Sequence, residues 1–267
     1  VVGLTDSCIE VRFESGNKRF VFPDAFGTYL ILLDKKAAAS VKRLKAKREE
    51  ELKKEELLHE QEKLERQEEI LRYLHREKLL KNLKIHPSSQ AAFWCDEEEQ
   101  GRVFADWQVT TGFIKSGTKK GQIATINRLN KNSACVFTFR APGIPEKERR
   151  IIGLYMVTED FIGKLCQDGI IPAHPEYRIR LTPEESGKML FWNYYRNDKY
   201  PNKIVWNAGK YRYLDNIWVA QMLKDIVSLK TDAEEKKLAK RFLEYYCDLN
   251  RIEIKELPNP EGELLRA

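Results

Sequence analysis

The feature that most constrains this chain is a long run without a helix breaker. From Lys35 to Ile85 neither glycine nor proline occurs, and alanine, leucine, glutamate, lysine and arginine dominate. These are the residues with the strongest helix propensity. His86-Pro87 follows, and proline ends a helix because it lacks the backbone N–H. The run therefore predicts one helix over residues 35–85, about 75 Å long.

This helix also carries most of the charge imbalance. It holds 16 of the 47 basic and 12 of the 41 acidic residues, counted from Asp34 to Lys84. Apolar residues at about seven-residue spacing give it a partial heptad seam, which Arg48 and Glu62 interrupt. Three roles stay open, namely a coiled coil that forms a homodimer through residues 35–85, a solitary charged spacer, and one arm of a helix hairpin. The residues of the seam are Leu57, Leu64, Ile70, Leu71 and Leu74.

Residues 1–34 alternate in the way of short strands. Ile9, Val11 and Phe13 share one face, a turn follows at residues 15–17, and Pro23 ends the return strand. Two strands are too few for independent stability. We therefore expect a third strand upstream of Val1, or another part of the chain across this hairpin. The pattern resembles the small Tudor-like barrels that serve as accessory modules.

Residues 87–257 predict a mixed α+β domain with flanking helices, followed by a flexible tail at 258–267. The two apolar runs around the loop 141–150 read as the central hairpin of a sheet. The further expected elements are a strand at 91–95, an acidic turn at 96–99, a strand at 176–181, a helix at 182–195, a hairpin of 203–206 with 210–214, and two C-terminal helices.

Composition excludes several classes of protein. The five cysteines lie far apart, so neither a disulfide framework nor a paired-cysteine metal site is predicted. No apolar run is long enough for a membrane span, and no signal peptide is visible. We therefore expect a cytoplasmic protein with free thiols. Outside the long helix the 31 basic and 29 acidic residues nearly balance, so net charge alone gives weak support for nucleic-acid binding.

No catalytic motif stands out. The stretch from Gly112 to Lys119 has glycines near a lysine, but a phosphate loop needs the lysine directly after its second glycine. Asp106, Glu176 and Asp215 have no spacing that ties them into a magnesium site. No catalytic residue, metal or cofactor is therefore assigned, and a nuclease or other hydrolase is kept as an alternative.

Aromatic residues with polar neighbours gather between residues 94 and 213. Two segments stand out, WNYYRN at 192–197 and WNAGKYRY at 206–213. Aromatic faces can stack on bases, and adjacent arginine and lysine can contact phosphates. The alternative is that these rings fill the core and hydrogen-bond at its edge. We take Trp192, Trp206 and Tyr211 as candidate ligand contacts, with Arg196 and Arg212 for the backbone.

The stretches AAFWC at 91–95, CVFTFR at 135–140 and RRIIGLYMV at 149–157 carry a resemblance. The order of these stretches resembles the PUA-like domains, including their EVE and YTH relatives. In those domains a strand with an aromatic residue opens the fold, and a later strand rich in Val and Phe pairs with a strand of the pattern I-x-G-x-x-x-V. Ile151, Gly153 and Val157 keep that spacing. The resemblance implies a β-barrel fold for this domain and a pocket that accepts one flipped or modified base. Here the loop between the two strands is longer than is typical of these domains.

Such a pocket needs aromatic walls and polar groups for the base edge. Trp94 and Trp107 are the expected walls, and Ser116 and Asn127 the expected edge readers. The hypothesis is a non-catalytic protein of bacterial or phage type that binds DNA or RNA, and the first alternative is a dimeric interaction scaffold. The further residues expected at the nucleic-acid backbone are Lys115, Lys119, Lys120, Arg128, Arg140, Arg149 and Arg150.

Overall fold

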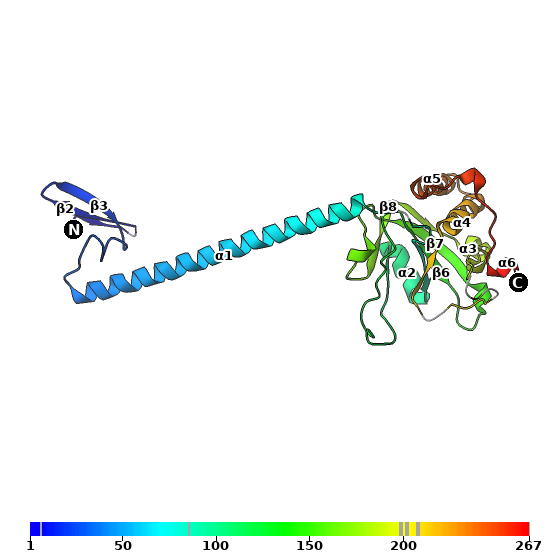
Figure 1. Cartoon of the computed structure of the whole chain (residues 1–267), viewed down its shortest axis with the longest axis horizontal. Helices are drawn as coiled ribbons and strands as arrows, with labels where there is room; N and C mark the ends of the chain where they lie inside the picture. Colours follow the sequence, from blue (N-terminus) through cyan, green and yellow to red (C-terminus); the bar gives the residue numbers. More distant parts are fainter. Residues whose placement is uncertain (6, 85, 198–199, 201–202, 207–208, 267) are drawn as a thin grey trace. The chain divides into compact units, whose positions relative to one another are not determined.

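The structure is a computed structural model that describes residues 1–5, 7–84, 86–197, 200, 203–206 and 209–266. It divides into two compact units, Val1–Lys78 and Leu79–Ala267, which are described separately. Figure 1 shows the elements of each, coloured along the chain. Helices and strands both contribute, so the predicted α+β class is confirmed.

The first unit begins with a small antiparallel sheet. Its strands are β1 (Gly3–Leu4), β2 (Cys8–Phe13) and β3 (Gly16–Val21), in that order across the sheet. Phe13 pairs with Gly16, whose φ of 111° is a left-handed conformation that favours glycine at the turn. The predicted hairpin is confirmed. The strand β1 takes the place of the third strand that was expected upstream.

The long helix follows as α1 (Lys35–Lys81), 47 residues long, with a length of about 70 Å. The carboxylate of Asp34 accepts a hydrogen bond from the Lys36 N–H at 2.8 Å and so caps the first turn. The helix ends four residues before the predicted limit at 85. Leu57, Leu64 and Leu71 are all more than half exposed in the single chain. The homodimer through residues 35–85 therefore stays a prediction.

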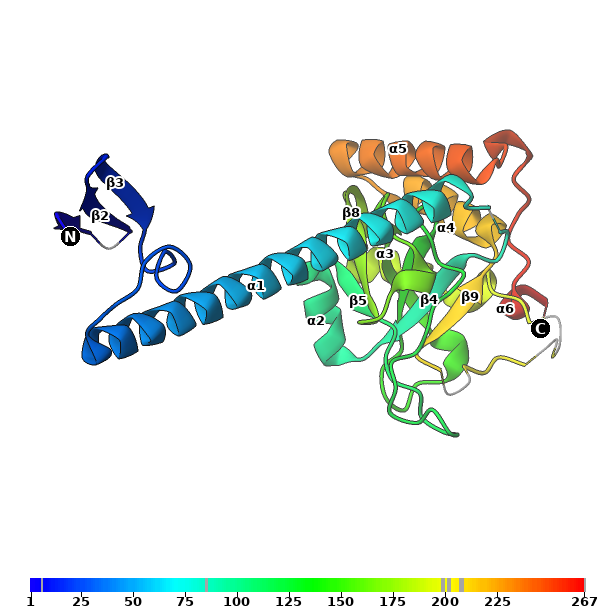
Figure 2. The same ribbon diagram turned by 60° about the vertical axis from the view of Figure 1, so that its left-hand side comes forward.

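The core of the second unit is a curled six-stranded sheet, visible in Figure 2. Its order is β5-β8-β7-β6-β4-β9, and β4 and β6 are parallel while the other neighbours are antiparallel. The predicted hairpin therefore occupies the centre of the sheet, as β6 and β7. The strand bounds are β4 (Gln90–Cys95), β5 (Gln108–Thr110), β6 (Ala134–Phe139), β7 (Arg150–Val157), β8 (Ile170–Arg180) and β9 (Tyr211–Leu214).

Each face of the sheet carries its own apolar core, because successive strand residues point to opposite faces. Val136 and its neighbours pack under helices α4 (Asn216–Leu229) and α5 (Ala233–Asn250). Phe137, the next residue, packs on the other face with Val103 of α2 (Glu97–Asp106). Figure 2 shows α4 and α5 together on one side of the sheet.

Gly153 marks the centre of β7. A Cβ at this position would lie 2.6 Å from the carbonyl oxygen of Ile179 on β8 and 2.7 Å from a ring carbon of Phe104. Only glycine leaves room for the ring of Phe104 against the strand. The glycine of the I-x-G-x-x-x-V pattern thus has a packing reason in this chain.

Three local predictions were wrong. The acidic stretch 96–99 begins α2 instead of a turn, because Asp96 and Glu99 form a capping box. The helix expected over 182–195 is the shorter α3 (Pro183–Lys188), followed by the 3₁₀ turn η3 (Phe191–Asn193). The strand β9 pairs with β4 and not with residues 203–206, and residues 207 and 208 of that expected hairpin lie outside the described part.

The segment after Pro258 is held against the domain, contrary to the expected flexible tail. The side chain of Gln221 donates to the carbonyls of Pro258 (3.0 Å) and Asn259 (3.1 Å). The short helix α6 (Glu263–Arg266) begins at Glu263, whose carboxylate is buried and accepts the Asn197 N–H at 2.8 Å. Residues 258–266 are therefore part of the folded unit.

All five cysteines are free, as predicted, and three of them, Cys95, Cys135 and Cys247, are buried. Within the described ranges no helix combines the length and the apolar character that a membrane span requires.

Candidate functional site

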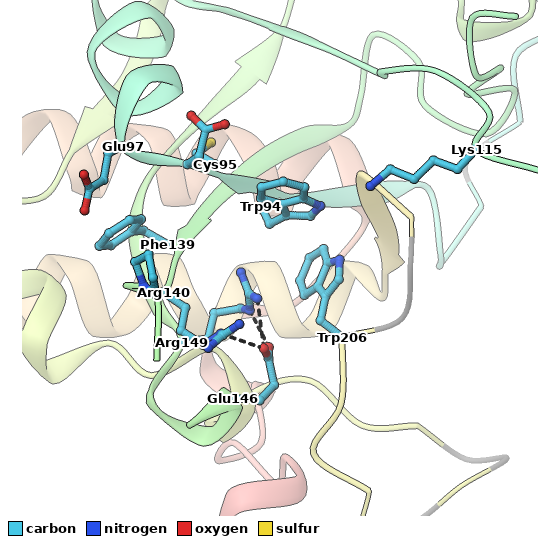
Figure 3. A pocket seen from close by; sticks show the side chains of 11 residues that line it. Trp94, Cys95, Glu97, Lys115, Phe139, Arg140, Glu146, Arg149 and Trp206 are labelled. Atoms are coloured by element: carbon cyan, nitrogen blue, oxygen red, sulfur yellow. Dashed lines mark hydrogen bonds and ion pairs between the residues drawn. The ribbon is translucent and has the colours of Figure 1, made fainter. Parts of the chain in front are cut away.

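A pocket of about 430 Å³ lies where β4 and β6 end. Because these strands are parallel, their C-terminal ends meet at one edge of the sheet, with Cys95 beside Phe139. Figure 3 shows the pocket from close by. Its volume is within the range of pockets that hold small ligands. It is lined by Trp94, Cys95, Asp96, Glu97, Lys115, Phe139, Arg140, Pro142, Glu146, Arg149 and Trp206.

Trp94 reaches the pocket because of strand alternation. Ala92, two residues earlier, points to the same face and is completely buried under the helices. Trp94 lies further along β4 and is only half-buried. The same alternation sends Phe93 and Cys95 into the opposite core. The strand β4 thus places the indole of Trp94 at the edge of the sheet, and the buried side chains of its neighbours in the strand hold β4 in position.

Trp206 joins the pocket from a segment more than a hundred residues later. Its Nε1 donates to the carbonyl oxygen of Gly209 at 2.9 Å. The Nε1 of Trp94 donates to the same oxygen at 3.2 Å, and a carbonyl oxygen can accept two such bonds. Figure 3 shows both rings at the pocket wall with their nitrogen edges toward the same side. One carbonyl therefore fixes the orientation of both indoles.

Two lysines lie over the ring of Trp94. The Nζ of Lys210 is 4.3 Å from the ring centroid, and the Nζ of Lys115 is 5.9 Å away. Both distances fall within the range of cation–π attraction. Lys210 is also paired with the carboxylate of Glu99 on α2. Lys115 comes from the exposed loop that follows β5, so Trp94 lies next to a cation that solvent can reach.

A carboxylate between two guanidinium groups forms the other wall. Glu146 accepts from Arg149 through both oxygens, Nε to Oε1 at 2.5 Å and Nη2 to Oε2 at 3.0 Å. The Nε of Arg140 is 3.0 Å from Oε2, and Trp192 Nε1 donates to Oε1 at 3.3 Å. Figure 3 draws the contacts of Glu146 with the arginines of this wall. Two positive charges against one negative charge leave this wall net positive.

Arg149 also supports the second tryptophan. Its guanidinium carbon is 4.6 Å from the ring centroid of Trp206, and its side chain is only 6% exposed. The guanidinium of Arg212 is 5.2 Å from the same ring and donates to the Val205 carbonyl at 2.7 Å and to the Tyr195 hydroxyl at 3.1 Å. Two arginines therefore hold the indole of Trp206 in place.

Cys95 borders the pocket while its side chain packs in the core on the other face of β4, and its thiol is uncharged. Burial raises the pKa of this thiol to about 12, and the nearby Lys210 only partly opposes that effect. The pocket thus combines two indoles with three basic side chains, Lys115, Arg140 and Arg149, and three acidic ones, Asp96, Glu97 and Glu146, so its charges balance. Such a set suits a flat, polar ring that stacks on an aromatic face and presents donors and acceptors at its edge.

Five residues that the sequence nominated separately meet in this pocket. Trp94, Trp206, Lys115, Arg140 and Arg149 all line it. The role of the two arginines differs from the expected phosphate contact. Their guanidinium groups are committed to Glu146, and that of Arg149 is buried. They shape the pocket wall.

Two of the nominated tryptophans do not line the pocket of Trp94. Trp107 does not line the pocket of Trp94, because it packs against Phe104 at a centroid distance of 5.4 Å and lies under Arg178. Trp94 and Trp107 therefore do not wall this pocket together, and a ligand contact of Trp107 stays a prediction. Trp192 is completely buried and cannot offer a face to a ligand. It acts through its hydrogen bond to Glu146.

The other nominated residues lie elsewhere in the unit. The hydroxyl of Tyr211 donates to the carbonyl of Thr125 at 2.6 Å, so this ring braces the loop that follows β5. Arg212 supports Trp206 and is not a free phosphate contact. Arg196 is half-buried. Exposed positions outside this pocket are occupied by Ser116, Asn127, Lys119, Lys120, Arg128 and Arg150.

Sequence reasoning missed Phe139, Lys210 and the Gly209 carbonyl. A signal for Phe139 existed, since it ends the strand whose centre was identified. No local pattern indicates that Gly209 receives the two indoles, because that contact depends on the pairing of β9 with β4. The loop 141–150 was expected between the two central strands, but the position of Glu146 between two arginines comes from three-dimensional packing.

The carboxylates considered for a nuclease have separate positions. Asp215 caps α4, Glu176 pairs with Arg241 at 2.8 Å, and Asp106 lines a different, smaller cavity. Among the residues that the structure describes, no group of three or more His, Cys, Asp or Glu side chains is arranged to hold a metal ion.

Comparison of the chain with models of protein families, with curated proteins and with solved structures gave no match.

Proposed function

We propose that this protein binds nucleic acid and holds one unpaired base in the pocket beside Trp94 and Trp206. The observation that carries the proposal is the shared carbonyl of Gly209, which fixes two partly buried indoles at the wall of an open pocket. Aromatic faces bind bases of any sequence by stacking. In this proposal the protein acts as a reader of a flipped or modified base.

Each part of the pocket has a role in this mechanism. The indole of Trp94 or Trp206 stacks on the base, and Glu146 holds Arg140 and Arg149 in the wall beside it. Lys115 contacts the phosphate next to the base, because it is exposed and lies beside Trp94. Binding of this kind weakens with salt, since each phosphate contact releases counterions.

The resemblance to PUA-like domains of the EVE and YTH type supports the same conclusion. The three stretches that carry it are β4, β6 and β7, which lie side by side in the sheet. The pocket lies at the end of two of these strands. In those relatives a concave pocket accepts one flipped base, and we propose that the pocket of Trp94 is its counterpart here.

The test is a titration of the full chain with single- and double-stranded oligonucleotides of DNA and RNA at two salt concentrations. Tryptophan fluorescence reports binding, because a base stacked on an indole quenches it. We expect affinity at low salt and a clear loss at high salt. Absence of binding to all of these polymers at low salt would contradict the proposal.

Variants locate the binding site. Trp94→Ala is expected to weaken binding about tenfold or more, because one base–aromatic stack contributes about 1–3 kcal/mol. Trp94→Phe keeps an aromatic face and is expected to retain most of the affinity. Tyr73→Ala is the control, since it removes an exposed aromatic ring from α1. Equal affinities for the Trp94→Ala and Tyr73→Ala variants would refute the assignment of the pocket.

A further inference from the structure

A second cavity, of about 520 Å³, adjoins the pocket at the end of β6. Phe139, the last residue of β6, lines both of them. The second cavity also contains Phe104 of α2 together with the exposed Arg150 and Arg180. We call it the arginine groove. The shared phenylalanine makes the pocket and the arginine groove neighbours across the end of the sheet.

Strand alternation distributes two consecutive arginines between the two cavities. Arg149 points to the same face of the sheet as Trp206, where its side chain is buried and paired with Glu146. Arg150 begins β7, pairs with Phe139 across the ladder and points to the opposite face. The pocket therefore receives the buried arginine and the groove receives the exposed one.

The two arginines of the groove differ electrostatically from those of the pocket. Among the residues that the structure describes, neither Arg150 nor Arg180 is in an ion pair, whereas Arg140 and Arg149 share Glu146. The guanidinium of Arg180 lies 5.0 Å from the ring centroid of Phe104, which holds it at the groove. Glu235 also lines the groove, but its carboxylate is paired with Lys230 at 2.8 Å.

We propose that the arginine groove binds the phosphodiester and the nucleotide adjacent to the base held in the pocket. This inference rests on the proposed function. Arg150 and Arg180 contact the phosphate by charge-assisted hydrogen bonds, and the ring of Phe139 lies between the two nucleotides. A duplex cannot place neighbouring nucleotides on opposite faces of a sheet edge, so the bound strand is single at these two positions.

The experiment compares three probes on the full chain: a nucleoside, the dinucleoside monophosphate of the same base, and a longer single strand of that base. The variant Arg150→Ala/Arg180→Ala removes both cations of the groove. The variant Lys164→Ala/Lys255→Ala removes two exposed cations away from the pocket and the groove and is the matched control. Thermal unfolding of each variant confirms that it is folded.

We expect the groove variant to bind the nucleoside like the wild type and to bind the dinucleoside monophosphate and the strand about tenfold more weakly. Its salt slope for the strand should flatten by roughly 0.7, since the two arginines contact one phosphate and each phosphate contact on a single strand contributes about 0.7. Arg150→Lys/Arg180→Lys should restore the slope, because the charges return.

The outcomes separate this inference from the function on which it rests. If the wild type binds no probe, the proposed function is wrong. If the wild type binds but the groove variant matches the control, the arginine groove has no role and this inference alone fails. An equal loss for the nucleoside and the strand would also overturn it, because the arginines would then act on the base in the pocket.

Discussion

Replacement of Gly153 by alanine tests the central packing of the second unit. The added Cβ would lie 2.6 Å from the Ile179 carbonyl oxygen and 2.7 Å from the ring of Phe104. The first distance is roughly 0.8 Å shorter than an ordinary contact, and the backbone of β8 cannot move away without breaking its ladder with β7. Overpacking in a core typically costs about 1–3 kcal/mol. With two simultaneous clashes we expect a loss of about 3 kcal/mol in the free energy of unfolding.

Urea denaturation followed by tryptophan fluorescence measures this loss. All five tryptophans lie in Leu79–Ala267, so the signal reports the second unit alone. Gly187→Ala is the matched control, because a Cβ there meets no heavy atom within 4 Å and the residue lies in α3. It should stabilise the unit by about 0.5–1 kcal/mol. A Gly153→Ala variant within about 1 kcal/mol of wild type would refute the packing argument.

Two further predictions concern buried polar groups. Lys230→Met should cost about 3 kcal/mol at neutral pH, because it leaves Glu185 without the ammonium group 2.9 Å away. Burial alone would raise the pKa of Glu185, but hydrogen bonds from Thr182 and Lys230 outweigh it and lower this pKa. The stability that the ion pair contributes is therefore present above the ordinary pKa of 4.5 and is lost as the pH falls through the lowered pKa. In urea titrations the difference in stability between variant and wild type should shrink over that pH range, and a constant difference would contradict the ion pair. The pKa of the Cys95 thiol is raised to about 12, so this thiol should resist iodoacetamide in mildly alkaline buffer until the protein is unfolded. Mass spectrometry of the labelled peptides measures the reaction. Rapid labelling of Cys95 in the native protein would contradict its burial.

Local patterns predicted much of the fold. The alternation in residues 135–157 placed β6 and β7 at the centre of the sheet, and the run without glycine or proline predicted α1 to within four residues at its C-terminal end. Both signals act over a few neighbours in the chain. The strand β9 was assigned a wrong partner because its true partner, β4, lies 120 residues earlier, and no local signal carries that pairing.

The candidate site was predictable only in part, for the same reason. Trp192 and Trp206 have similar neighbours in the sequence, yet Trp192 is completely buried while Trp206 borders the pocket. Arg149 and Arg150 are adjacent and chemically identical, yet one is neutralised by Glu146 and the other is exposed. Burial and ion pairing depend on which elements meet, so the type of a residue and its neighbours do not determine its role.

The shared carbonyl of Gly209 has a consequence for the order in which the protein forms during synthesis. Trp94 leaves the ribosome about 115 residues before the oxygen that its indole contacts. Until β9 has been made, β4 lacks one of its two neighbours in the sheet. Contacts of such long sequence separation form late in folding. Nascent chains that end before Gly209 are therefore expected to contain the β6–β7 hairpin without a finished pocket, and ligand binding should appear only when the strand that follows Gly209 has emerged.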